Sequence, residues 1–268
     1  MNVLIVFAHP EARSLNAAMR DVCVEELQAQ GHTVQVSDLY AMRFKPVVDR
    51  DDFPLLPPGE RLKVAAASQA GYAAGALTDD VLAEIAKLQW ADALILHFPL
   101  WWYTMPAILK GWVERVFAYG FAYGVGEHSD AKWGDRFGEG SLSDKRAMVI
   151  TSTGGWQAHY SARGINGPLD DILFPINHNI LYYPGAAVLP PFVVYRADRL
   201  QETDFPPIAE ALRARMRGLF SDAPIAYRRQ NGGDYEIPGC ELKAGLARPG
   251  SGGFGLHVAS GGSGEPLA

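Results

Sequence analysis

The sequence is poor in cysteine: only Cys23 and Cys240 occur among its 268 residues, and they lie far apart. Two isolated thiols provide neither a disulfide framework nor a cluster of metal ligands, and they favour a reducing compartment. No apolar run is long enough to span a bilayer, and the opening residues MNVLIVFAHP contain no basic leader. We therefore expect a cytoplasmic protein with no metal ion and no integral membrane segment.

An excess of positive charge is also missing. Thirty acidic and 24 basic side chains leave a formal net charge of −6. A basic surface is the electrostatic footprint of proteins that bind nucleic acids or anionic membranes. The composition therefore gives no reason to expect a nucleic-acid partner.

Two glycine-rich nucleotide motifs, G-x-G-x-x-G and G-x-x-x-x-G-K-[ST], do not occur either. The apolar residues 2–9 instead predict a buried first strand, followed by a loop and a helix that runs to about Gln30. Ser14 is a good N-cap for this helix, and the free amides at a helix start can hold a phosphate. Plain capping explains Ser14 and Asn16 equally well, so this loop alone decides nothing.

The most informative stretch is residues 92–117. Residues 93–98 form a short apolar run closed by Pro99, which is typical of a strand buried on both faces. The apolar spacing after Pro106 predicts a helix that starts there. Aromatic rings in the loop between them are costly to expose, so a flat ligand is favoured over a local hydrophobic corner. The loop contains Leu100, Trp101, Trp102 and Tyr103.

The rest of the chain continues this alternation of strands and helices. Further strands are expected at residues 33–39, 147–152 and 187–195, and further helices at residues 60–75, 79–90 and 207–220. Residues 40–58 are expected to be an irregular surface excursion. Beyond Pro224 the chain loses periodicity and becomes rich in glycine, serine and proline. We expect one domain of residues 1–223 and a C-terminal arm of residues 224–268.

Five strands that alternate with helices predict an α/β fold, a doubly wound five-stranded parallel sheet of flavodoxin type. In such a sheet the loops after the first, third and fourth strands meet at one crevice. The third of these loops contains Gly154 and Gly155, which let a backbone approach a ligand closely or simply make a turn. Because all three loops carry unusual residues, their convergence strengthens the prediction of a ligand site.

Several segments occur in the same order in a known protein family. They are LIVFAHPEARSLNAAM, SDLYAMRFKPV, FPLWWYTMPAILKGWVERVF, STGGWQAHYSARGINGP and, more weakly, GGFGLHV. With these segments the chain resembles the flavin-dependent NAD(P)H:quinone oxidoreductases of the DT-diaphorase type. The resemblance implies a homodimer that holds FAD and reduces a quinone by two electrons. NADH or NADPH would be the hydride donor, and donor and acceptor would occupy one site in turn.

The resemblance also implies roles for individual residues. The residues expected at the ribityl and phosphate portion of the flavin are His9, Ser14, Leu15 and Asn16. Those expected along its ring system are Pro99, Leu100, Trp101, Trp102 and Tyr103. Those expected at its pyrimidine side are Ser152, Thr153, Gly154, Gly155 and Tyr160. The residues expected at the substrate are Tyr123, which would reach across the dimer, Trp156 and Tyr183.

Two positions depart from the family's pattern. The family's charge relay uses a tyrosine, matched by Tyr160, and a histidine, whose position is occupied by Asn166. Asparagine can donate a hydrogen bond but cannot become a cation, which puts the relay in doubt but not the hydride transfer. The family's adenine-side arginine falls on Phe205, with Arg196 and Arg199 nearby as substitutes. FAD is expected because the long arm matches the larger FAD-binding members, and FMN is the alternative.

Other functions stay open on the sequence alone. The chain could be a flavin-binding regulatory or ancillary subunit of a membrane transporter, which would bind flavin yet turn over quinone poorly. Azo or nitro compounds are alternative acceptors. One histidine is assigned to the core instead of the site: His97 lies within the predicted central strand and is expected to be buried with its hydrogen bonds satisfied.

Overall fold

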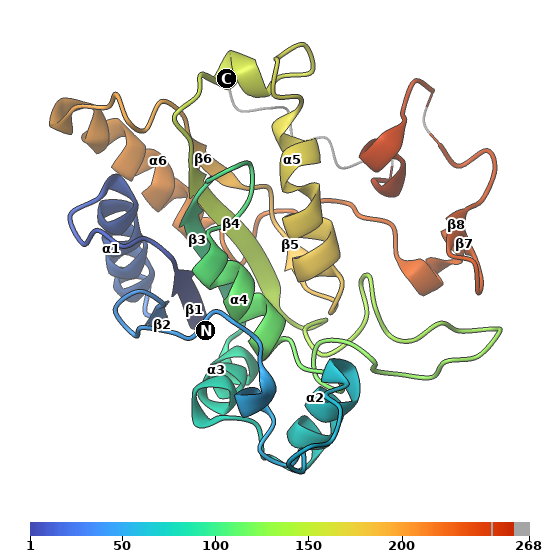
Figure 1. Ribbon diagram of the computed structural model, residues 1–268. Helices are drawn as coiled ribbons and strands as arrows, with labels where there is room; N and C mark the ends of the chain where they lie inside the picture. The colour runs from blue at the N-terminus through green and yellow to red at the C-terminus, as the bar shows by residue number, and fades with distance from the viewer. Residues whose placement is uncertain (248, 260–268) are drawn as a thin grey trace.

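A parallel β-sheet forms the centre of the computed structural model, which describes residues 1–247 and 249–259 (Figure 1). Its strands are β1 (Asn2–Phe7), β2 (Thr33–Asp38), β3 (Ala93–Pro99), β4 (Arg146–Ser152), β5 (Ala187–Val188) and β6 (Phe192–Val194). Their order is β2-β1-β3-β4-β5, with β6 also paired to β4, and all these pairs are parallel. This order is the flavodoxin-like one that the alternation of elements predicted.

Helices cover both faces of the sheet (Figure 1). One face packs against α1 (Leu15–Ala29) and α6 (Phe205–Arg217), and the other against α3 (Asp79–Trp90), α4 (Ala107–Val116) and α5 (Leu169–Ile176). Helix α2 (Val64–Ala73) lies next to α3 in the chain. Every residue of β3 is buried. A central strand that is buried throughout and apolar except for His97 suits a sheet covered on both faces.

Local signals fix several helix ends. The Ser14 hydroxyl accepts a hydrogen bond from the Ala17 amide at 3.1 Å and caps α1, as predicted. Gly31, just past the end of α1, has a φ of 80°, which favours glycine. Helix α3 begins after Thr78, also as predicted, but the Thr78 hydroxyl makes no capping bond and instead accepts from Arg115.

Prolines account for two differences from the sequence-based expectations. The expected last strand, residues 187–195, is split into β5 and β6, because Pro190 and Pro191 have no N–H to donate to the ladder. Helix α5, with Pro175 inside it, and the wide helical turn Asn177–Tyr182 were not predicted. Proline normally ends a helix, but a widened turn accommodates it here.

Residues 40–58 are less superficial than expected. The almost fully buried side chain of Arg115 in α4 donates to Asp52 at 2.8 Å and to Asp80 at 2.5 Å. Asp52 and Phe53 are themselves buried. The segment therefore covers part of the core, held by an ion pair between residues far apart in the sequence.

The described part of the C-terminal arm, residues 224–247 and 249–259, lies on the side of α5 (Figure 1). It contains the short antiparallel pair β7 (Tyr235–Glu236) and β8 (Glu241–Leu242). The buried Arg228 side chain donates to the carbonyls of Leu246 and Leu256 at 2.8 and 3.1 Å. Residues 260–268 of the predicted arm lie outside the described residues, and the domain boundary at residue 223 stays a prediction. Within the described residues, no helix has the length and apolar character to cross a membrane.

Candidate active site

Three loops meet at the carboxyl edge of the sheet, because β1, β3 and β4 are neighbours in it. The ring centroids of His9 in the first loop and Trp101 in the second are 6.0 Å apart. The Leu100 amide donates to the Ser152 carbonyl at 2.8 Å, which joins the second loop to the third. The buried Asn16 side chain donates to the Ser152 hydroxyl at 2.9 Å and joins the first to the third. The loops meet where the strand order reverses, the usual ligand position in such sheets.

The loop after β3 displays its aromatic side chains outward. Trp101, Trp102 and Tyr103 are 42%, 92% and 51% exposed. Trp102 and Tyr103 have φ values of 50° and 62°, in the left-handed region that bulky residues rarely adopt. A local hydrophobic corner would have buried these rings, so that alternative is wrong for this loop. Backbone strain that exposes aromatic rings is typical of a ligand site.

The first turn of α1 lies at the same edge of the sheet, where Asn16 contacts Ser152. Helix geometry leaves the amides of Leu15 and Asn16 without an acceptor inside the helix. Ser14 caps the turn through Ala17, so its hydroxyl has the structural role that the sequence left open. Amides of this kind are suited to a phosphate group.

The glycine pair after β4 packs on Tyr160. A Cβ atom at Gly155 would lie 2.7 Å from the Tyr160 ring, so no larger residue fits there without a shift. The Tyr160 hydroxyl is 2.5 Å from the Thr153 hydroxyl, and the Tyr160 side chain is buried. Gly154 is exposed. The loop thus fixes a tyrosine hydroxyl beside backbone that a flat ligand can approach closely.

The two predicted catalytic side chains have different partners. The Tyr103 hydroxyl donates to the Asn166 side-chain oxygen at 3.2 Å. The backbone N–H of Asn166 donates to the His159 carbonyl at 3.0 Å. Among the hydrogen bonds of the described residues, none joins Asn166 to Tyr160. Asn166 therefore contacts the aromatic loop, and Tyr160 contacts the glycine loop.

Two of the predicted substrate residues line one hollow of about 230 Å³. Its lining residues are Val113, Phe117, Ala122, Tyr123, Asn179, Ile180 and Tyr183. Burial raises the pKa of the Tyr123 hydroxyl. The third predicted substrate residue, Trp156, is not among the lining residues. Its ring lies 3.9 Å from the guanidinium carbon of Arg196 instead.

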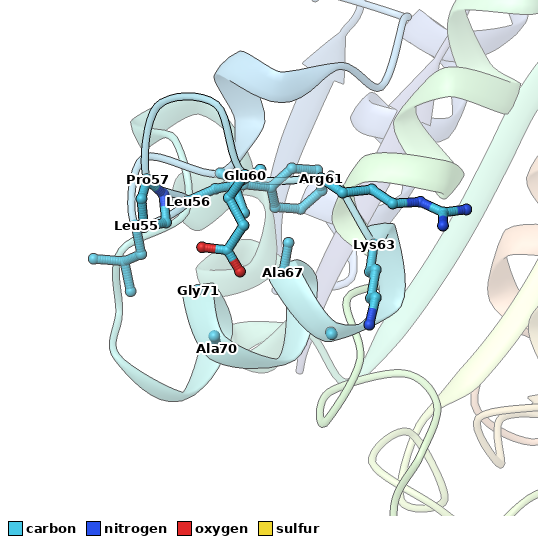
Figure 2. A pocket seen from close by; sticks show the side chains of 11 residues that line it. Leu55, Leu56, Pro57, Glu60, Arg61, Lys63, Ala67, Ala70 and Gly71 are labelled. Carbon is cyan, nitrogen blue, oxygen red and sulfur yellow. The ribbon is translucent and has the colours of Figure 1, made fainter.

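A larger hollow of about 430 Å³ lies between α2 and the segment before it. Figure 2 shows Ala67, Ala70 and Gly71 of α2 on one side and Leu55, Leu56 and Pro57 on another. Most of its lining is aliphatic, and none of the predicted site residues belongs to it. Size alone therefore does not mark the candidate site.

His97 differs from the expectation in one respect. It is fully buried, as predicted, but neither ring nitrogen has a hydrogen-bond partner. The Phe7 ring meets it edge-on, with centroids 5.3 Å apart. Burial, with smaller effects from Arg20 and His9, lowers the pKa of His97 to about 3. The histidine is therefore an uncharged core residue whose polar atoms are unsatisfied.

The strand order, together with the meeting of the loops after β1, β3 and β4, defines a protein of the flavodoxin-like class. A family model described as a flavodoxin-like fold matches residues 1–219. A ribosyldihydronicotinamide dehydrogenase-like protein of Penicillium crustosum is 59% identical over 258 residues, which cover 96% of each chain. The NAD(P)H dehydrogenase (quinone) 1 of Cavia porcellus is 36% identical over 84% of this chain and 79% of its own.

One solved structure is also very similar. It is that of a candidate quinone reductase from Klebsiella pneumoniae, with a TM-score of 0.94 and 54% identity, and it covers 97% of this chain and 100% of its own. The chain belongs to the flavodoxin-like family of NAD(P)H:quinone oxidoreductases. The resemblance seen in the sequence motifs is thereby confirmed.

Proposed function

We propose that this protein binds a flavin and reduces quinones by two electrons, with NADH or NADPH as donor and one site used by donor and acceptor in turn. The observation that carries the proposal is the exposed aromatic loop of residues 101–103 beside the first turn of α1 and the Gly154–Gly155 backbone. A bound flavin would supply hydride chemistry at this place.

The residues present fit a flavin. The amides of Leu15 and Asn16 suit its phosphate, and the outward rings of Trp101 and Trp102 offer a flat apolar wall. The glycine loop leaves room for a close approach. We prefer FAD to FMN, because the long arm matches the larger members and the Arg196 guanidinium lies beside this loop. FMN is the alternative.

Tyr160 and Asn166 have separate roles in this proposal. Tyr160, fixed by Thr153, places one hydroxyl beside the glycine loop, where a preoriented donor would stabilise developing negative charge. Asn166 stays neutral and holds the Tyr103 hydroxyl in place. Proton transfer through a histidine at position 166 is therefore not part of the mechanism.

We also propose that two chains form a homodimer through the region of residues 112–121. Tyr123 would then reach the flavin site of the second chain, and the hollow that it shares with Tyr183 would become part of the acceptor cavity. Leaving Val113, Phe117 and Ile180 around an open hollow would expose apolar surface. The free thiols Cys23 and Cys240 support a cytoplasmic location.

A second class of hydride donor is a candidate beside NADH and NADPH. The Penicillium crustosum relative is named ribosyldihydronicotinamide dehydrogenase-like, so a dihydronicotinamide riboside is to be compared with NADH and NADPH. Rates of quinone reduction with the three donors at equal concentration decide among them.

An absorbance experiment tests the function directly. The purified protein is expected to show a flavin spectrum that bleaches when donor is added and returns when a quinone follows. Colourless protein that takes up no flavin on incubation would contradict the assignment. A flavin that bleaches but is not reoxidised by quinones would favour a flavin-binding regulatory or ancillary subunit of a membrane transporter. Preferential reoxidation by azo or nitro compounds would favour an azo- or nitro-compound reductase.

A further inference from the structure

Phe137 has an unusual backbone conformation. It lies in the glycine-rich loop before β4 and has a φ of 50°, which is rare for a bulky side chain. Its amide donates to the Tyr183 carbonyl at 2.8 Å, and its own carbonyl accepts from the Gln230 amide at 3.2 Å. Such a conformation persists only where the surroundings hold it in place. Here those surroundings are Tyr183 on one side and the C-terminal arm on the other.

A continuous stack of rings connects the same two regions. Phe254 of the arm stacks on Phe174 with ring centroids 4.3 Å apart, and Phe174 stacks on His178 at 4.4 Å. His178 stacks on Phe137 at 4.8 Å, and Phe137 meets the Tyr183 ring edge-on at 5.0 Å. Three rings packed in series therefore connect Phe254 of the arm to Tyr183.

Arg136 makes a second connection. Its guanidinium donates to the Gln230 side chain at 2.5 Å and contacts the Cys240 sulfur at 3.7 Å. It also lies over the Tyr183 ring, 5.8 Å from the ring centroid. Gln230 is only 3% exposed, and it donates to the Trp133 carbonyl as well. Two separate sets of contacts thus run from the arm to Tyr183.

We propose that the C-terminal arm sets the position of Tyr183 in the acceptor hollow, with Phe137 as the main positioning residue. The inference rests on the proposed function, because Tyr183 borders the hollow that we assign to the acceptor. The described part of the arm contributes no residue to the lining of that hollow. Its effect on the acceptor is therefore indirect, through the ring that it holds in place.

Equilibrium binding tests the proposal without turnover. A water-soluble benzoquinone is dialysed against the oxidised holoprotein, which has no electrons to give it. Phe137→Leu is expected to raise the dissociation constant by about two- to tenfold, the typical effect of one aromatic pair. Phe137→Tyr keeps the ring and is expected to bind as the wild type does. Phe254→Ala changes a half-exposed side chain and is expected to weaken binding in the same direction.

Steady-state kinetics separate positioning from a general loss of structure. Phe137→Leu is expected to raise the KM for the quinone while kcat stays within about twofold of the wild type. In a Tyr183→Leu background, Phe137→Leu is expected to have no further effect, because the contact that transmits it is gone. Trp133→Leu is the matched control: its ring lies in the same loop but contacts His128.

The outcomes are distinct. Unchanged quinone affinity in both Phe137→Leu and Phe254→Ala would overturn the proposal, and so would effects that add fully to those of Tyr183→Leu. If Phe137→Leu fails to fold, Phe254→Ala decides alone. A wild-type protein that binds the quinone but never reduces it would contradict the proposed quinone reduction. It would not contradict the inference that the arm positions Tyr183.

Discussion

Tyr160 is the residue whose surroundings most closely match a catalytic role. Its ring is held by Gly155 and its hydroxyl by Thr153. If this hydroxyl faces the developing charge, Tyr160→Phe should slow flavin reduction about tenfold to a thousandfold in stopped-flow measurements. Tyr195→Phe is the matched control, because that ring lies 5.8 Å from Tyr160. Reduction of Tyr160→Phe at the wild-type rate would show that Tyr160 is not catalytic.

Asn166 gives a separate prediction. Asn166→Ala should cost less than Tyr160→Phe, because it removes one neutral hydrogen bond to Tyr103. Asn166→His should introduce a pH dependence of flavin reduction between about pH 5 and 8, where an imidazole titrates. The wild type should lack it. A wild-type titration in this range that disappears in His159→Gln would mean that His159 supplies the cation.

His178 makes the stability of the protein depend on pH. Burial lowers the pKa of His178 to about 4, and repulsion from His257 adds to this effect. The hydrogen bond that His178 Nδ1 donates to the Asn179 side-chain oxygen opposes it more weakly than burial lowers it. The unfolded chain takes up this proton near pH 6.5, so the stability that His178 contributes is fully present above that pH and is lost as the pH drops towards 4. The loss is on the order of 3 kcal/mol.

Urea unfolding at several pH values measures this effect. His178→Phe keeps a ring in the stack and should lose less stability than the wild type between pH 6.5 and 4. The tyrosines Tyr182 and Tyr227, which also face His178, do not titrate in this range: burial raises the pKa of Tyr182 to about 12 and that of Tyr227 further. Parallel pH profiles for the two proteins would contradict the assignment.

At the scale of elements, Gly111 decides how closely α4 approaches residues 40–58. A Cβ atom there would lie 1.9 Å from the Pro46 carbonyl oxygen, which is backbone and cannot turn away. Alanine normally stabilises a helix interior by about 1 kcal/mol over glycine. Here the cost of overpacking, about 1–3 kcal/mol or more, should exceed that gain in helix propensity. Gly111→Ala is therefore expected to lower the free energy of unfolding.

Gly71 in α2 is the matched control for Gly111. A Cβ atom at Gly71 would meet the Leu77 side chain at 2.5 Å, and a leucine side chain can change rotamer. Gly71→Ala should therefore cost less than Gly111→Ala in the same unfolding experiment. Equal effects would mean that the backbone contact at Pro46 does not limit the approach of α4.

Elements with strong apolar periodicity were predictable from the sequence. Strand β3 and helix α3 lie within one residue of their expected bounds, because burial alone determines their pattern. Helix α5 was not, since Pro168 and Pro175 signal loops locally and only packing against the core overrides that signal. The split of the last strand follows the local signal of the Pro190–Pro191 pair, which the expected strand of residues 187–195 had passed over.

The candidate site was predictable to a similar extent. Strand order placed the three loops together, and the motifs named most of the residues in them. The partnership of Asn166 with Tyr103 and the contacts of Phe137 with Tyr183 could not be inferred. Both join side chains that are distant in the sequence, and neither depends on a periodic pattern.

At the scale of the whole molecule, the open hollow beside α4 leads us to expect a dimer. Light scattering at micromolar concentration should give a mass near twice the 29.2 kDa of one chain. Burial of apolar side chains around the hollow would drive the association. A mass near that of a single chain would count against the homodimer and against the reach of Tyr123 into a second site.

A charge in the hollow tests whether this face forms the interface. Ile180→Asp places a carboxylate among the lining residues and should produce a monomer, because an unpaired charge in an apolar interface is costly. Ile208→Asp is the matched control. Ile208 lies in α6 and is also half-buried, but it packs on the opposite face of the sheet. A monomer with Ile180→Asp and a dimer with Ile208→Asp would locate the interface.

The same monomer should also lose affinity for quinone, because the cavity walls contributed by Tyr123 and Tyr183 of the second chain would be missing. If Ile180→Asp stays dimeric, the two chains associate through another surface, and the acceptor cavity must be complete within one chain.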